Sequence, residues 1–204
     1  MSHCAAIVAP DHPFVDELVA ELGAHVLRVP PARLDEPLAG WSGEPLVWMH
    51  MVPAGAGAEL DEAALLLRSA ERATMAAAEA AAPLTFLALV PSRGLFAGPA
   101  GLASDLARGA LEALMRTAIG TWSARGHRLL GVVYAGIDGH ALVGQRTPEE
   151  VRLRTPIGRA AGTAELANAI RYLGSPLAAY VTGTLVHVDG GWNAYSWIYP
   201  ARTI

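Results

Sequence analysis

Lysine is absent from this sequence: all 15 residues counted as lysine or arginine are arginine. An arginine guanidinium does not lose its proton in proteins, so it cannot replace a lysine amine that has to titrate. Any catalytic role that depends on a lysine is therefore excluded.

Cysteine and long apolar runs are also scarce. Cys4 is the only cysteine, which excludes an internal disulfide and a metal cluster built on cysteines, and we expect it to be a small buried residue on the first strand. The apolar runs at 73–82 and 84–90 are interrupted by Glu79 and Pro83 or are too short, because a membrane span needs about 20 residues. We therefore expect no transmembrane helix.

The sequence contains no long run of like charges, and its formal net charge is −4. Since nucleic-acid binding needs a basic patch, we expect no nucleic-acid partner. The first ten residues, MSHCAAIVAP, lack the basic segment that begins a secretory signal. We expect a cytoplasmic protein that does not bind membranes.

Apolar residues, in contrast, make up 52% of the 204 residues. This content is enough to form one hydrophobic core and argues against disorder.

The range from Arg154 to Trp192 has the clearest pattern. Thr163 and Glu165 are typical of a helix start, where a threonine caps free N–H groups and an acid favours the helix dipole. An apolar stripe and a Gly-Ser-Pro break follow. A buried strand is then predicted within 180–188, closed by an Asp-Gly-Gly turn.

The order of these residues resembles the C-terminal third of the short-chain dehydrogenase/reductase family. The family pattern P-x-G-R, P/T-E-x-A, L-x-S and Y-x-T-G-x-x-x-x-V-D-G-G is carried by Pro156, Gly158, Arg159, Glu165, Ala167, Leu173, Ser175, Tyr180, Thr182, Gly183, Val188, Asp189, Gly190 and Gly191. The resemblance implies a single α/β domain over 1–204, with a Rossmann-like doubly wound parallel sheet of about six strands flanked by helices. An aromatic tail, 192–204, is expected to anchor the end of the chain.

The N-terminal half departs from the family. Residues 5–9 predict a strand and 14–22 a helix, but the turn between them, Pro10 to Pro13, contains no glycine to let backbone N–H groups approach a pyrophosphate. We interpret Asp11 as the cap of the helix, with Pro13 in its first turn. From Val29 to the next strand there are too few residues for the family's helix and strand, so we expect one βα unit to be lost or shortened.

The family's catalytic set is also incomplete. Ser92 fits its serine, but Ser104 stands at the tyrosine position and Arg108 at the lysine position, and no tyrosine lies between Ser92 and Tyr134. In the family the tyrosine transfers the proton and the lysine lowers its pKa and holds the ribose. Structural roles remain open: Arg108 in an ion pair, Ser92 as a turn hydroxyl, and Ser104 with Asp105 as helix caps. The family's active-site asparagine would fall near residues 68–69 and is absent.

Two functions follow as hypotheses. The first is a catalytically degenerate, non-catalytic subunit that assembles with a homologous active dehydrogenase. This chain is then expected to bind no cofactor or metal itself, and NAD(P) is expected in the partner. If no such partner exists, we expect a homo-oligomer. The second is a cofactor-independent lyase or isomerase, or a small-ligand binder, that reuses the crevice. Its weak candidate residues are Ser92, Arg108, His50 and Tyr134, and it requires them to converge in one pocket.

Overall fold

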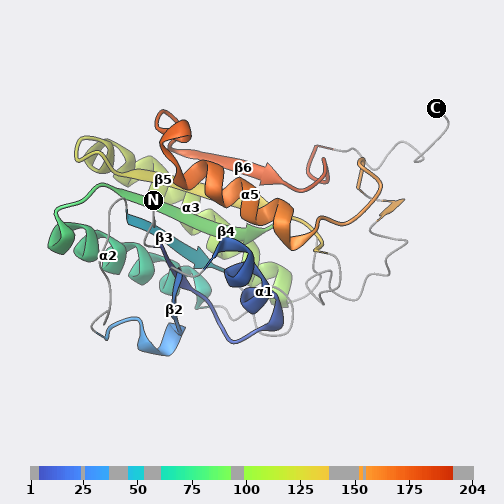
Figure 1. Cartoon of the computed structure of the whole chain (residues 1–204), viewed down its shortest axis with the longest axis horizontal. Coiled ribbons are helices and arrows are strands. Elements are labelled where there is room, and N and C mark those ends of the chain that lie inside the picture. Colours follow the sequence, from blue (N-terminus) through green and yellow to red (C-terminus); the bar gives the residue numbers. More distant parts are fainter. Residues whose placement is uncertain are drawn as a thin grey trace.

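The protein was analysed as a computed structural model, which describes residues 5–23, 26–36, 46–52, 61–92, 99–137, 152–153 and 155–194. Six parallel strands form one sheet in the order β2-β1-β3-β4-β5-β6 (Figure 1). The strands are β1 (Ala5–Val8), β2 (Val26–Val29), β3 (Leu46–Met51), β4 (Leu84–Pro91), β5 (Arg128–Tyr134) and β6 (Thr184–Val188). The helices are α1 (Pro13–Leu22), α2 (Glu62–Ala80), α3 (Pro99–Ser123) and α5 (Thr163–Gly174), with short 3-10 turns η1 (Pro31–Arg33) and η3 (Pro176–Ala178).

The strand order confirms the predicted Rossmann-like sheet. The chain passes from β1 outward to β2, then returns to the other side of β1 with β3 and continues to β6. The order in which strands are added to the sheet therefore reverses between β1 and β3, although all strands remain parallel. In doubly wound sheets the ligand crevice lies at this point, outside the carboxyl ends of the strands. Among the described residues β2 forms one edge, as expected for a sheet that has lost a βα unit at that side.

Alternating side chains of the strands build two cores. Trp48, Phe86 and Leu129 face α2 and α3, whereas Met49, Leu87 and Leu130 face α1 and α5. Figure 1 shows the same arrangement, with α1 and α5 in front of the sheet and α2 and α3 behind it. Because successive residues of a strand point to opposite faces, this pattern fixes the face on which each strand residue lies.

The last strand differs from the prediction. We expected a buried strand, but β6 is only half-buried, with exposed side chains at Thr184 and His187. It is also shorter than the predicted range, beginning at Thr184. The reason is its position: β6 pairs with β5 on one side only and is therefore an edge strand among the described residues.

Three predicted helix caps are wrong. Asp11 does not cap α1; His12 does, accepting a hydrogen bond at Nδ1 from the backbone N–H of Phe14 at 3.1 Å. Pro13 does lie in the first turn, as expected. Gly162, not Thr163, precedes the first turn of α5.

The third correction concerns α3, which begins at Pro99, so Ser104 and Asp105 lie inside the helix and cannot cap it. Within the described residues, none of the helices has the length and apolar character needed to cross a bilayer.

Candidate functional site

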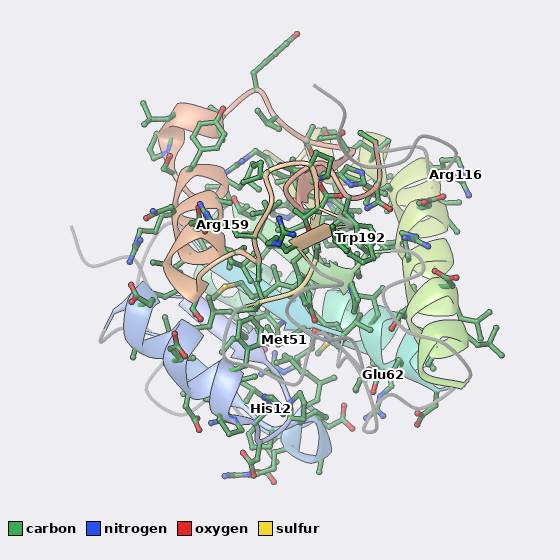
Figure 2. The ribbon with its side chains drawn as sticks, turned by 90° about the vertical axis from the view of Figure 1, so that its right-hand side faces the viewer. His12, Met51, Glu62, Arg116, Arg159 and Trp192 are labelled. Carbon is green, nitrogen blue, oxygen red and sulfur yellow. The ribbon has the colours of Figure 1, made fainter. Side chains whose placement is uncertain are left out.

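In Figure 1 the arrows of β3, β4 and β6 point toward the right-hand side, which is the side that faces the viewer in Figure 2. Because the six strands are parallel, their carboxyl ends lie at the same edge of the sheet. In Figure 2, His12 at the start of α1, Met51 at the end of β3 and Arg159 beside α5 all lie on this side. Because crevices of doubly wound sheets lie at this edge, it is where a nucleotide or a substrate would bind.

The turn between β1 and α1 does not fit a dinucleotide pyrophosphate. The backbone N–H of Phe14 is already bonded to the imidazole of His12, and Pro13 has no N–H to offer. Asp11 adds an exposed carboxylate at the same turn. A pyrophosphate needs free N–H groups and a favourable charge at a helix N-terminus, and Asp11, Pro13 and Phe14 provide neither.

Arg28 on β2 holds this turn in place. Its guanidinium donates to the carbonyl oxygen of Pro10 at 2.8 Å and pairs with Asp11 at 3.0 Å. It also pairs with Asp16 in the first turn of α1. The positive charge near the turn is therefore bound by the chain's own carboxylates, so that it is not free to bind phosphate.

Arg108 is buried in α3, with only 3% of its surface exposed, and pairs with Asp105 one turn earlier. Ser104, at the position of the family's tyrosine, is equally buried. A serine hydroxyl has a pKa far above the value of about 10 for tyrosine, and arginine remains protonated. These side chains therefore cannot supply the family's proton transfer. Arg108 forms an ion pair, as its structural interpretation predicted, but it is buried, whereas that interpretation placed the pair on the helix surface or at an interface.

Ser92 follows β4 and is 3% exposed. Its hydroxyl accepts a hydrogen bond from the side-chain amide of Asn193 at 3.0 Å, and its backbone N–H donates to the carbonyl oxygen of Tyr134 at 2.8 Å. Asn193 in turn donates to the carboxylate of Asp189 at 2.9 Å and contacts Nδ1 of His187 at 3.2 Å. The serine therefore belongs to a network that joins the ends of β4, β5 and β6.

His50 and Tyr134 are both fully buried. Neither ring nitrogen of His50 has a hydrogen-bond partner in the described part of the chain, and burial lowers the pKa of this imidazole to about 3. The hydroxyl of Tyr134 donates to the carbonyl oxygen of Val52 at 3.3 Å. Burial raises the pKa of this phenol above its ordinary value, which makes it a poorer proton donor.

The structure does not bring these four candidates together. Tyr134 packs against Phe14 on the α1 and α5 face, with ring centroids 6.1 Å apart. His50 neighbours Met49 along β3 and so faces the opposite side, with Trp48. A binding site in this crevice would require His50 and Tyr134 to face the same pocket, but they lie on opposite faces of the sheet.

The position of the family's asparagine on α2 has a structural role. Ser69 is fully buried and accepts a hydrogen bond from the indole N–H of Trp48 at 2.9 Å. Arg68, its neighbour, pairs with Asp35 at the surface. Both side chains hold α2 to the rest of the domain, and neither replaces the missing amide.

Comparison with known proteins assigns the family. The family model described as enoyl-(acyl carrier protein) reductase matches residues 59–193, about two thirds of the chain. The chain belongs to the short-chain dehydrogenase/reductase family. This family membership and the parallel sheet confirm the resemblance seen in the sequence.

Individual relatives cover less of the chain. An uncharacterized short-chain type dehydrogenase/reductase, y4vI, from Sinorhizobium fredii is 31% identical over 104 residues, which are 48% of this chain and 19% of that protein. Cis-4-hydroxycyclohexanecarboxylate dehydrogenase from Sinomonas cyclohexanicum is 37% identical over 92 residues, 43% of this chain and 36% of that protein. The chain thus matches well under half the length of these relatives.

The fold extends further than the sequence similarity. The crystal structure of an oxidoreductase of the short-chain dehydrogenase/reductase family from Burkholderia thailandensis superimposes with a TM-score of 0.75 and covers 96% of this chain and 94% of that chain. The sequence identity is 19%, so this likeness shows the fold and says nothing about the reaction.

A separate pocket of about 330 Å³ lies beside the last two strands. Its walls come from residues 135–136 after β5, from the segment 155–161 with Glu165 of α5, and from residues 187–191. None of Ser92, Arg108, His50 and Tyr134 lines it. Two of its charged side chains, Arg159 and Glu165, form a two-point ion pair with both N–O distances at 2.7 Å.

Sequence reasoning missed the network around Asn193. From the sequence, Asp189 is recognisable only as part of the family's V-D-G-G turn, and neither His187 nor Asn193 belongs to that pattern. No local pattern predicts the bond between Ser92 and Asn193, because these residues are 101 positions apart and meet only in the folded sheet. Cys4, which was expected on the first strand, and residues 195–204 of the aromatic tail lie outside the described residues.

Proposed function

We propose that this chain is a non-catalytic member of the short-chain dehydrogenase/reductase family, a pseudoenzyme that assembles with an active NAD(P)-dependent partner of the same family and supports it. The chain itself binds no nucleotide in this proposal, and the partner holds the NAD(P). A cytoplasmic location, expected from the sequence, belongs to the same proposal.

The observation that carries the proposal is the turn between β1 and α1. Its helix N-terminus is capped by the chain's own His12, and Arg28 is bound to the carboxylates of Asp11 and Asp16. A pyrophosphate could bind at this turn only if these contacts were broken, and the turn has no glycines that would let backbone N–H groups approach the phosphate. The buried Arg108 at the lysine position, which pairs with the half-exposed Asp105, supports the same conclusion for proton transfer.

Exposed apolar side chains on α2 and α3 support the assembly role. Four of them are 45% to 53% exposed: Leu67, Met75, Leu102 and Leu106. The family resemblance assigns the long helix at α2 to a dimer interface, and its many alanines allow another backbone to approach closely. Because α2 and α3 pack against each other, a partner that docks on these two helices would cover these side chains.

The partner is proposed from the same reasoning. A homologous subunit has the corresponding helices and can form a pseudo-symmetric version of the family contact. A relative is named as a dehydrogenase, and we take an active protein of that general kind as the expected partner. Its substrate belongs to the partner's own site.

Affinity purification tests the proposal. A tagged copy of this chain, produced in the cells that make it naturally, should retain a second short-chain dehydrogenase/reductase that has an intact tyrosine and lysine, in a fixed ratio. The control is the same tag on a soluble monomeric protein. A purified chain that remains a monomer and retains no family member would refute the assembly role.

A further inference from the structure

The pocket beside β6 is independent of the assembly proposal. It lies where the ends of β5 and β6 meet the start of α5, and Arg159, labelled in Figure 2, is part of its wall. Its volume of about 330 Å³ is in the range of small-molecule sites. Much of the wall is apolar, since Ala135, Ile157, Ala160 and Val188 all line it. A ligand here would therefore bury an apolar body, and the polar groups of the wall would select its charge.

One carboxylate of the wall is satisfied by neutral donors only. Asp189 is 6% exposed, and its oxygens accept hydrogen bonds from the backbone N–H groups of Gly191 and Asn193 and from the side-chain amide of Asn193. These neutral donors fill three acceptor positions of the carboxylate, which has about four, without cancelling its negative charge. Nδ1 of His187 lies 3.5 Å from the same carboxylate, and this imidazole is charged only when it is protonated.

The arginine in the described wall does not supply the missing positive charge. Arg159 binds both carboxylate oxygens of Glu165 through two guanidinium nitrogens, with both N–O distances at 2.7 Å. These two side chains balance each other. With a neutral His187, the described wall therefore keeps one net negative charge, that of Asp189. Such a charge attracts a cation and repels an anion, and more strongly in a partly enclosed pocket than in water.

The wall also contains a hydroxyl group without a partner. Thr155 lines the pocket and is 5% exposed, and its Oγ1 has no hydrogen-bond partner in the described part of the chain. Burying a polar group without a hydrogen bond is unfavourable. Because a hydroxyl oxygen can accept hydrogen bonds, a ligand that brings N–H groups into the pocket would satisfy it.

We propose that this pocket binds a small organic cation, a primary ammonium group on an apolar body. The ammonium group lies near Asp189 and donates one hydrogen bond to Oγ1 of Thr155, while the apolar body lies against Ile157 and Val188. An ammonium group has three N–H donors and no acceptor, which matches a wall that offers a carboxylate and a hydroxyl oxygen. The site needs neither nucleotide nor partner, and no covalent or redox step is part of the proposal.

Probes with one ring and different charges test the class of ligand. At pH 8 cyclohexylamine is a cation, cyclohexanecarboxylate is an anion and cyclohexanol is uncharged, while histidines are largely neutral. Nuclear magnetic resonance titration of the purified chain should show cyclohexylamine binding with a dissociation constant of about one millimolar, the scale expected for so few atoms. The other two probes should bind at least about tenfold more weakly. Equal or tighter binding of either one would overturn the proposal.

Two pairs of variants locate the binding and test the charge. Ala160→Leu should fill the pocket and abolish the cyclohexylamine shifts, whereas Ala164→Leu, an exposed alanine on α5 outside the lining, should leave them unchanged. His187→Lys places a permanent positive charge beside Asp189 and should weaken cyclohexylamine binding at least about tenfold. Thr184→Lys adds the same charge at an exposed position of β6 outside the lining and should have little effect.

The hydroxyl of Thr155 gives a readout that a structural role would not move. Thr155→Val keeps the shape and removes an unsatisfied group, so it should weaken cyclohexylamine binding about three- to tenfold without lowering the stability of the free chain. Thr85→Val is the matched control, because Oγ1 of Thr85 accepts a hydrogen bond from Arg128 at 2.8 Å outside the pocket. That variant should lose stability and keep its affinity for cyclohexylamine.

Two results would refute the proposed site. One is cyclohexylamine binding that survives in a folded Ala160→Leu chain, and the other is an unchanged affinity in both His187→Lys and Thr155→Val. Circular dichroism establishes that each variant is folded. Neither result would affect the assembly role, which affinity purification tests separately.

Discussion

At the scale of single residues, His50 is the least satisfied group in the described core. It is fully buried and neither ring nitrogen has a partner there. Burying a polar group without a hydrogen bond costs about 1–3 kcal/mol in proteins. The sequence named His50 as a candidate residue of the crevice, but it could not show whether the imidazole faces a pocket or the core, because that depends on which side chains pack against β3.

His50→Leu should therefore stabilise the protein. We expect a gain of about 1–2 kcal/mol in the free energy of unfolding, measured by urea denaturation at pH 7. The matched control is His127→Leu, because Nδ1 of His127 accepts a hydrogen bond from the backbone N–H of Leu84 at 3.0 Å. That variant should lose stability by a similar amount. A destabilised His50→Leu protein would show that this imidazole has a partner in solution.

The same histidine predicts a pH dependence. Burial lowers the pKa of His50 from its ordinary value of 6.5 to about 3. Between these values the unfolded chain binds a proton that the folded chain does not, so stability falls as pH decreases from about 6.5 to about 3, by up to about 1.4 kcal/mol per pH unit. Denaturation series at several pH values should show that His50→Leu reduces this slope. An unchanged slope would contradict the assignment.

The residues at the family's catalytic positions show which features of the site could be predicted from the sequence and which could not. Ser92 and Arg108 were found by their spacing in the motif, and the ion pair expected for Arg108 is observed with Asp105, although Arg108 is buried and not on the helix surface. The partner of Ser92 was not found, because Asn193 reaches it across the sheet. Local spacing identifies residues that share one helix or strand, whereas contacts between distant segments depend on the register of the folded sheet.

At the scale of elements, most helices and strands could be predicted, and the errors lie at their ends. The starts of α1 and α5 were assigned to the residue type with the highest capping preference, but the caps are His12 and Gly162. Capping preferences are statistical, whereas the actual capping residue depends on where the preceding strand or loop ends and the helix begins. The burial of β6 was misjudged for a related reason, since an apolar run does not reveal whether the strand has a neighbour on both sides.

The start of α5 provides a test of its own. Glu165 accepts bonds from Arg159 and from the backbone N–H of Gly162, and the hydrogen bond from Arg159, together with that from Gly162, lowers the pKa of Glu165 to about 2. The stability that this ionised carboxylate contributes is present above its ordinary value of 4.5 and is lost as pH falls toward about 2.

Glu165→Gln should lower the free energy of unfolding at pH 7 by about 0.5–1 kcal/mol, a modest amount because both side chains are about half-exposed and solvent screens the pair. The difference from the native protein should disappear near pH 2. Glu71→Gln on α2, an exposed residue without a described ion pair, should change neither quantity. Equal effects of both substitutions would indicate that general surface charge, rather than this pair, is responsible.

At the scale of the whole molecule, the sequence predicted the fold, whereas the function that it suggests is a proposal. The C-terminal motif sufficed to indicate a parallel sheet of about six strands because its residues shape a helix, a strand and a glycine turn that recur in the family. Function depends on departures from the family, and a departure shows which chemistry is missing without showing what has replaced it.

The exposed apolar side chains of α2 and α3 predict an effect on assembly. Leu67→Glu, Leu102→Glu and Leu106→Glu should each reduce retention of the partner at least about tenfold, since a charge buried in an apolar interface costs several kcal/mol. Circular dichroism should remain that of the native chain. Ala20→Glu, an exposed position on α1, should retain the partner fully, and loss of the partner in that control instead would place the interface elsewhere.

The most direct test of the central claim is a calorimetric titration of NADH and NADPH, first into the isolated chain and then into the purified complex. We predict no binding by the isolated chain at millimolar nucleotide, and in the complex one nucleotide for each partner chain and none for this one. Nucleotide binding to the isolated chain at one site per chain, with a micromolar dissociation constant, would contradict the account.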